Sequence, residues 1–163
     1  MTKSARIFKK HNHANCTKEA LKTFEQHCLK KNLQVTPLRR KILGYLLADH
    51  RPLGAYEILD LLRKEGFSST PPIAYRVLDF LITEGFVHKV KGLNAFIACT
   101  DPGSVHSPIF MICRKCKKVA EVSDVDDQID LPQYISDDFN VENTNVELLG
   151  VCTSCGKMES ARC

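Results

Sequence analysis

The sequence lacks an N-terminal secretory segment, and its apolar residues never form a long uninterrupted run. The longest such run extends from about Ile42 to Ala48, far short of the roughly 20 apolar residues that a membrane-spanning helix requires. We therefore expect a soluble, cytoplasmic protein that is neither exported nor inserted into a membrane. In that reducing compartment, the eight cysteines are expected to remain thiols or metal ligands.

The patterns of zinc hydrolases and deaminases are also missing. No HxE motif precedes a PCxxC motif, and no glutamate is placed as a general base beside an open zinc site. The sequence therefore favours a binding protein without catalytic residues.

Two CxxC pairs are present, and they determine where two distant segments must meet. They consist of Cys113 with Cys116 and Cys152 with Cys155, and each pair is expected in a tight loop. Disulfides are the alternative interpretation, but cysteines two residues apart rarely make a useful cross-link. Four thiolates in this pattern can converge on one tetrahedral Zn²⁺. Such a closed site has no open position for a substrate, so we expect a structural zinc whose binding energy is largely folding energy.

Charge is distributed unevenly along the 163 residues, a length that allows one ordinary domain or two small ones. Residues 1–100 carry 17 Lys/Arg and 8 Asp/Glu, whereas residues 101–163 carry 6 and 11. This asymmetry indicates that the first half meets a polyanion and the second does not. Solvated helix faces would account for part of it.

The first hundred residues predict helices followed by a hairpin. Residues 1–15 are basic and aperiodic and are expected to form a flexible arm, in which His11 and His13 have no assigned role. The periodicity and the Thr-Pro start signals predict helices over residues 16–31, 37–48, 55–64 and 71–84. Alternating runs at 86–90 and 95–99 around a Gly-Leu-Asn turn predict a β-hairpin. Helices closed by such a hairpin make a winged helix.

Beyond this, residues 100–105 are predicted to form a hinge, and residues 106–163 a second domain. Strands are expected at 109–113, 119–122 and 139–151, with a helix at 124–136. The predicted fold class is α+β: a flexible arm (1–15), a winged helix-turn-helix domain (16–99), a hinge (100–105), and a small α/β domain (106–163) that holds the four-cysteine zinc site.

The helix that begins at Pro71 is the expected recognition helix, which in a winged helix enters the DNA major groove. Tyr75 and Arg76 lie one turn into it, where they can reach base edges or phosphates; packing or simple solvation is the alternative for each. Tyr56, at the start of the preceding helix, is placed for the DNA backbone. Further positive charge for non-specific, salt-dependent attraction comes from Arg39, Arg40, Lys41, Lys89 and Lys91.

A second cluster of metal-ligand residue types consists of His88, Cys99, His106 and Glu121. The predicted hairpin places His88 and Cys99 nearly opposite one another, at the roughly 4.5–5.5 Å that separates the Cβ atoms of cross-strand neighbours. His106 follows the hinge and Glu121 lies in the second domain, so a cation held by all four would join the domains. A thiolate in the set favours Zn²⁺ over iron or manganese. Taken singly, each residue also has an ordinary structural interpretation.

These motifs resemble the ferric uptake regulator superfamily, and most closely its zinc uptake regulator branch. The matching phrases are Thr36-Pro37-Leu38-Arg39, Pro71-Pro72-Ile73-Ala74-Tyr75-Arg76-Val77-Leu78, Gly85-Phe86-Val87-His88-Lys89 and both CxxC pairs. The resemblance implies a homodimeric winged-helix repressor in which 106–163 is the dimerisation domain. It also implies structural zinc on the four paired cysteines and regulatory zinc on His88, Cys99, His106 and Glu121, two zinc ions per chain.

Departures from the family pattern also point to zinc. The histidine-rich run of iron-sensing members is reduced here to His106, and no histidine-rich tail follows the second CxxC pair. No metal role is assigned to Cys16 or Cys28, for which packing is the default, nor to Cys163 at the terminus.

The function predicted from sequence is a zinc-responsive repressor of zinc-uptake genes that binds a palindromic DNA operator. Asp60 and Arg63, exposed on the helix before the recognition helix, could form contacts between dimers on DNA, or a local ion pair. Two alternatives remain open: a regulator of the same family that senses iron, manganese, nickel or peroxide, and a zinc-stapled DNA-binding protein without a metal switch.

Overall fold

The computed structural model describes residues 13–49, 51–103, 106, 108–122, 138–140 and 144–160. The chain divides into two compact units, an N-terminal unit within Lys9–Ser104 and a C-terminal unit within Val105–Cys163. In the part of the chain that is described, no helix has both the length and the apolar character needed to cross a membrane.

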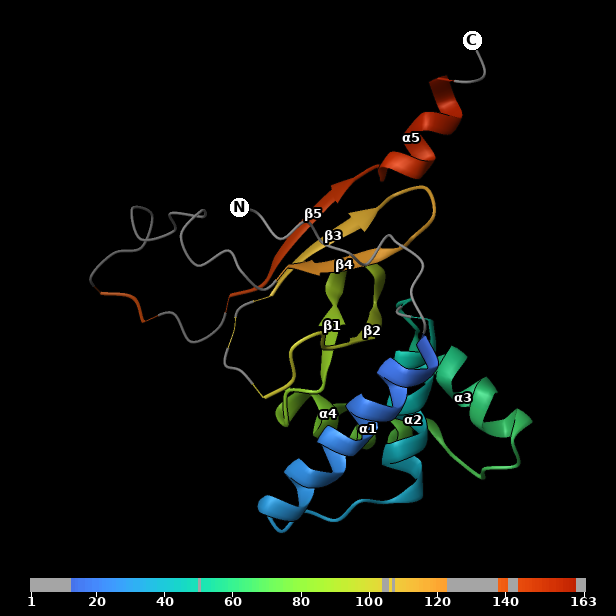
Figure 1. Ribbon diagram of the computed structural model, residues 1–163, viewed down its shortest axis with the longest axis vertical. Helices are drawn as coiled ribbons and strands as arrows, with labels where there is room; N and C mark the ends of the chain where they lie inside the picture. Colours follow the sequence, from blue (N-terminus) through green and yellow to red (C-terminus); the bar gives the residue numbers. More distant parts are fainter. Residues whose placement is uncertain are drawn as a thin grey trace. The chain divides into compact units, whose positions relative to one another are not determined.

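Four helices build most of the N-terminal unit (Figure 1). They are α1 (His13–Lys30), α2 (Pro37–Asp49), α3 (Ala55–Lys64) and α4 (Pro71–Thr83). The helix starts follow the predicted signals: proline occupies the first position of α2 and of α4, and the Thr36 hydroxyl accepts a hydrogen bond from the Arg39 N–H at 3.2 Å. The predicted helix at 55–64 is observed with the same bounds.

Helix α1 begins earlier than expected. Residues 13–15 are helical, so the predicted flexible arm (1–15) is too long at its C-terminal end, and residues 1–12 lie outside the described part. The physical reason is cooperativity: no proline or glycine interrupts 13–30, so a helix nucleated by the apolar stripe extends backwards at little cost.

A two-stranded hairpin follows α4. Strand β1 (Val87–Val90) pairs antiparallel with β2 (Ala95–Ala98) through the short 3-10 turn η2 (Lys91–Leu93), and Asn94 is left-handed at φ 46°. Leu53 extends this sheet by one bridge, exchanging two 2.9 Å backbone hydrogen bonds with Phe96. One core, which includes Phe24, Leu46 and Leu78, binds the helices to the hairpin. Each fully buried side chain of this size contributes about 1.5–3 kcal/mol.

Helices α3 and α4 are each followed by the same three residues, Glu-Gly-Phe. The glycines, Gly66 and Gly85, have φ of +80° and +76°. In each case the phenylalanine N–H returns to a carbonyl of the last helical turn, from Phe67 to Leu62 and from Phe86 to Leu81, both at 2.9 Å. This left-handed closure explains the glycines and reverses the chain sharply after each helix.

The C-terminal unit contains a three-stranded sheet in the order β4-β3-β5 (Figure 1). Strand β3 (Ile109–Cys113) pairs antiparallel with β4 (Val119–Val122) and parallel with β5 (Val146–Gly150). A parallel neighbour requires a crossover connection. The predicted helix at 124–136 falls in that connection, outside the described residues.

Two C-terminal predictions are wrong. The last strand was expected over 139–151, but Phe139 and Asn140 are not in a strand and β5 covers only Val146–Gly150. The second CxxC pair was expected in a tight loop, but it lies in helix α5 (Thr153–Ser160) and the residue before it. Strand pairing, which decides how far β5 extends, depends on β3 and is not visible in the local pattern. The overall α+β class is as predicted.

Candidate metal centres and nucleic-acid interface

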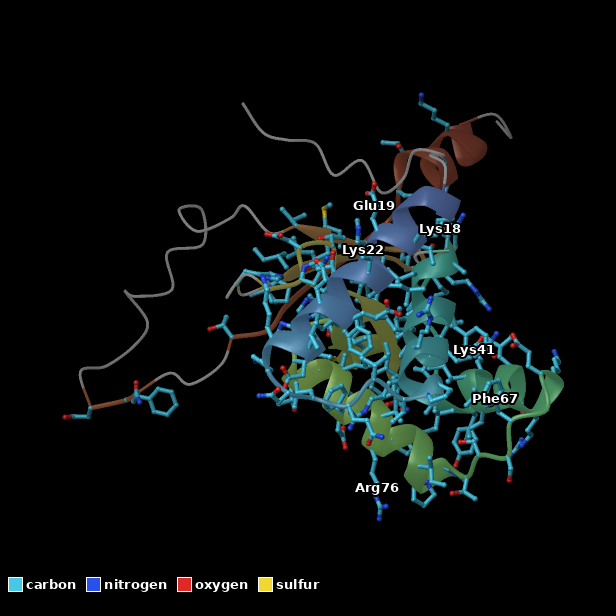
Figure 2. The ribbon with its side chains drawn as sticks, turned by 60° about the horizontal axis from the view of Figure 1, so that its bottom comes forward. Lys18, Glu19, Lys22, Lys41, Phe67 and Arg76 are labelled. Carbon is cyan, nitrogen blue, oxygen red and sulfur yellow. The ribbon has the colours of Figure 1, made fainter. Side chains whose placement is uncertain are left out.

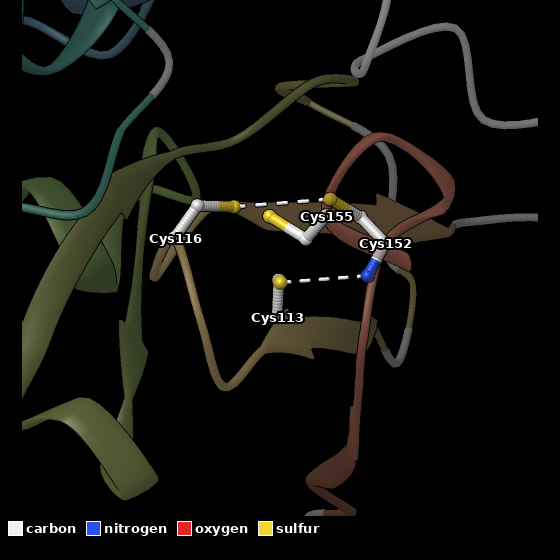
Figure 3. Close-up of side chains that lie close together, drawn as sticks. All are labelled: Cys113, Cys116, Cys152 and Cys155. Atoms are coloured by element: carbon white, nitrogen blue, oxygen red, sulfur yellow. Dashed lines mark hydrogen bonds between the residues drawn. The ribbon is translucent and has the colours of Figure 1, made fainter. Parts of the chain in front are cut away.

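The four paired cysteines converge in the C-terminal unit (Figure 3). Cys113 ends β3, Cys116 lies in the turn that follows, and Cys152 and Cys155 flank the start of α5. Their sulfur atoms all lie within 4.8 Å of one another, and all four are free thiols. The Cys116 and Cys152 Sγ atoms are 3.8 Å apart, which equals the edge of about 3.8 Å expected of a tetrahedron with Zn–S bonds of about 2.3 Å. This donor set fits a single Zn²⁺.

Backbone amides stabilise a negative charge on one sulfur atom of the same cluster. The Cys152 N–H donates to the Cys113 Sγ at 3.4 Å. Hydrogen bonds from the backbone N–H groups, that of Cys116 first and that of Cys152 second, lower the pKa of Cys113 to about 6. The hydrogen bond with Cys152, followed by burial, raises the pKa of Cys155 to about 12. One thiolate is therefore stable at neutral pH, and full ionisation of the set requires a cation at its centre.

His88 and Cys99 form a pair on the hairpin of the N-terminal unit. The register places His88 opposite Ile97, and Cys99 donates its N–H to the Phe86 carbonyl at 2.9 Å. The two residues are thus diagonal neighbours on one face rather than nearly opposite one another as predicted, because the turn after Val90 is one residue longer than the predicted Gly-Leu-Asn. A ring nitrogen of His88 and the Cys99 Sγ nevertheless lie within 4.8 Å.

His106 and Glu121 form a pair in the C-terminal unit. The His106 Nε2 and the Glu121 Oε1 are 2.9 Å apart, and the Glu121 side chain, on β4, is fully buried. Burying a carboxylate is costly unless it is paired or coordinates a metal. The contact with His106 meets that requirement. It places one nitrogen donor and one oxygen donor side by side, both largely shielded from solvent.

The first half of α4 presents the residues predicted to read DNA. Its inner face buries Ala74, Val77, Leu78 and Leu81. Tyr75 is 39% exposed, and Arg76 is also exposed, with its side chain extending away from the helix (Figure 2). Tyr56, at the start of α3, is 69% exposed. These side chains are presented to solvent and are not required by the core.

The cations at the start of α2 are engaged within the unit. The Arg39 guanidinium lies 3.4 Å above the Phe80 ring and donates to the Gln34 carbonyl, contacts that the sequence pattern did not indicate. Arg40 pairs with Glu25, and Lys41 with Glu65. On the hairpin, Lys89 is exposed beside the Phe96 ring.

Sequence reasoning missed the contribution of backbone groups and of α1. The amide of Cys152 is available to Cys113 only because β5 runs parallel to β3, a long-range pairing. His27, on α1, contacts Glu84 at 2.7 Å, although 57 residues separate them in the chain. No periodicity or motif relates residues so far apart.

Comparison with known proteins places the chain in a family. Residues 30–149 match the model of the ferric uptake regulator family. The zinc uptake regulation protein of Escherichia coli (strain K12) is 32% identical over 152 residues, which cover 90% of this chain and 86% of that protein.

Two solved structures share the fold. A zinc uptake regulator complexed with zinc and DNA is 30% identical, with a TM-score of 0.79 over 88% of this chain and 97% of that one. Holo XcZur is 33% identical, with a TM-score of 0.73 over 85% and 98%. Together with the family match, these similarities show that the chain belongs to the ferric uptake regulator family.

Proposed function

We propose that this protein is a zinc-responsive, DNA-binding transcriptional repressor of zinc-uptake genes. Members of its family are regulators and not enzymes. The observation that carries the choice of zinc is the pairing of the Cys99 thiol with the His88 imidazole on the hairpin of a winged helix. A sulfur donor in the responding site favours Zn²⁺ over iron or manganese. Relatives described as zinc uptake regulators support the same choice.

One zinc would be structural and held by the four converging cysteines. The free thiols, their mutual distances and the low pKa of Cys113 support this assignment. A bound ion would join the end of β3 to the start of α5 and contribute folding free energy.

A second, regulatory zinc would be held by His88 and Cys99 from one unit and by His106 and Glu121 from the other. Each pair is already assembled within its own unit, which supports its use as half of a site. A cation bound by both halves would link the units across the hinge at 100–105. The orientation that is competent for DNA would then be favoured only when zinc is present.

The DNA partner would be a palindromic operator read by Tyr75 and Arg76 of α4. Tyr56 and Lys89, together with the positive charge of Arg39, would supply attraction to phosphates. Asp60 and Arg63 form an exposed pair at 2.9 Å within α3. A contact between dimers on DNA would require them to exchange this local pairing for one with a neighbour.

A homodimer would bring two recognition helices to the two half-sites of such an operator. The sheet edge formed by β5 supports it. Among the described residues no strand pairs with the outer edge of β5, and Leu148 and Leu149 there are 50% and 73% exposed. An exposed apolar edge strand is a ready template for pairing with a second copy.

The test is operator binding by fluorescence anisotropy at buffered free zinc, with the zinc content measured after chelation. We expect two zinc ions per chain and a zinc-dependent gain in affinity of about 5- to 150-fold, the usual range of allosteric coupling. His88→Ala and Cys99→Ser should remove the gain. Cys28→Ser is the matched control, because it makes the same change at an equally buried thiol outside both clusters.

The same assay separates the alternatives. A larger response to iron, manganese, nickel or peroxide would identify a different effector. A Cys99→Ser protein that still responds normally to zinc would remove the reason for choosing zinc. One tight zinc per chain and no change in operator affinity would identify a zinc-stapled DNA-binding protein without a switch.

A further inference from the structure

The last turn of α1 contacts the point where the recognition helix ends. Glu84, the residue that caps the C-terminus of α4, accepts a hydrogen bond from Lys31 Nζ at 2.9 Å and lies 2.7 Å from His27 Nε2. The Glu84 side chain is only 12% exposed and that of His27 21%. A carboxylate this well shielded from solvent interacts more strongly with its partners than a carboxylate at the surface does.

The C-terminal half of α1 also contacts the residue that precedes the hairpin. The rings of His27 and Phe24 both meet Phe86 edge to face, with centroids 5.1 Å apart. Phe86 precedes β1, its carbonyl accepts the Cys99 N–H at 2.9 Å, and His88 follows two residues later. Helix α1 therefore supports the backbone that carries both hairpin ligands of the proposed regulatory zinc.

The connection between these two contacts is short and stiff. Gly85 at φ +76° and the Phe86-to-Leu81 hydrogen bond reverse the chain within two residues of the end of α4. A tilt of α4 must therefore move the start of β1, because no flexible residues lie between them.

We propose that His27 and Lys31 are positioning residues that act through Glu84. They fix the orientation of the recognition helix relative to the His88–Cys99 pair, so that zinc bound at the hairpin changes DNA affinity. This inference rests on the proposed function. It assigns the coupling to a junction inside the N-terminal unit, in addition to any link across the hinge.

The chain contains its own control for this junction. The Glu-Gly-Phe closure at the end of α3 has the same geometry, and Glu65 there pairs with Lys41 as Glu84 pairs with Lys31. The chain that follows Glu65 continues into α4, whereas the chain that follows Glu84 continues into the hairpin. Glu65→Gln therefore removes a Lys–Glu pair at the same kind of helix end, although a more exposed one, without touching the proposed coupling.

The experiment measures the coupling factor, which is the ratio of operator dissociation constants in chelator and in saturating zinc. The intact chain, Glu84→Gln and Glu65→Gln are compared, with thermal melting of each. We expect Glu84→Gln to reduce the factor by about 2- to 30-fold, the effect of couplings carried by non-contacting residues. Glu65→Gln should leave it within about two-fold, since freeing Lys41 changes DNA affinity equally with and without zinc.

Two further variants keep the test decisive if Glu84→Gln fails to fold. His27→Leu cannot bond Glu84 and should lower the coupling factor, whereas His27→Gln keeps a donor and should restore most of it. A factor unchanged in Glu84→Gln and His27→Leu, with melting lowered, would overturn the inference and leave the junction a purely structural contact. An intact chain without any zinc dependence would instead overturn the proposed function, and this inference with it.

Discussion

At the scale of single residues, Glu84 shows how a tertiary contact changes the chemistry of a carboxylate. The hydrogen bond from His27, and then that from Lys31, holds the pKa of Glu84 below its ordinary value. A carboxyl whose pKa is lower in the folded than in the unfolded state stabilises the fold above the unfolded pKa, about 4.3. That contribution is lost as the pH falls through the folded pKa.

The corresponding prediction concerns acid stability. Glu84→Gln should lower the free energy of unfolding by about 1–2 kcal/mol at pH 7, because it removes a hydrogen-bonded charge. The difference between the intact chain and the variant should shrink below about pH 4, where both carry a neutral group. Urea unfolding of both proteins from pH 7 to pH 3 checks this. A difference that is constant with pH would mean that the charge of Glu84 is not what stabilises the junction.

Residue types and their spacing indicated which cysteines come together, but not how a cation packs within the fold. The CxxC spacing alone indicated that the four cysteines converge, because this spacing is typical of thiolates that share one metal ion. Arg39 was expected to supply positive charge for DNA, yet its guanidinium covers Phe80. The sequence shows that an arginine begins α2 but not that a phenylalanine of α4 lies beneath it.

At the scale of elements, two glycines differ in whether the backbone conformation requires glycine. Gly85 closes α4 at a positive φ that a side chain disfavours, although nothing lies within 4 Å of where its Cβ would stand. Gly44 lies inside α2, where a Cβ would equally meet nothing within 4 Å, and its backbone has no need of glycine. The cost of replacing either one is therefore conformational rather than steric.

Alanine at the two positions should act with opposite sign. Gly85→Ala should destabilise the fold by about 1–2 kcal/mol, the cost of a left-handed residue with a side chain. Gly44→Ala should stabilise it by about 0.5–1 kcal/mol by restoring helix propensity. Urea midpoints measured under one metal condition test both. A destabilised Gly44→Ala protein would show that the surface over α2 is needed for close approach by another group.

At the scale of the whole molecule, the exposed edge of β5 carries the prediction of assembly. Leu149 is 73% exposed on that edge, and Leu29, on α1 of the other unit, is 78% exposed. For an isolated chain the two leucines are equivalent surface residues, and a charge at either should be tolerated. In a dimer built on β5, only Leu149 would be buried.

Leu149→Glu should therefore shift the protein from dimer to monomer, because it places a charge in an apolar interface, whereas Leu29→Glu should not. Sedimentation velocity over a range of protein concentrations measures the mass of each. Equal masses for both variants and the intact chain would place the dimer interface elsewhere.

The sequence by itself determined the local features: the proline-led starts of α2 and α4, the glycine-closed ends of α3 and α4, the hairpin, and the residue types that can serve as metal ligands. These depend on backbone preferences and donor chemistry within a few residues. Only the tertiary structure decided that Cys99 lies diagonal to His88, that α1 reaches Glu84, that Arg39 covers Phe80 and that β5 is short. Each of these follows from the packing of segments far apart in the chain, where burial and pairing outweigh local preference.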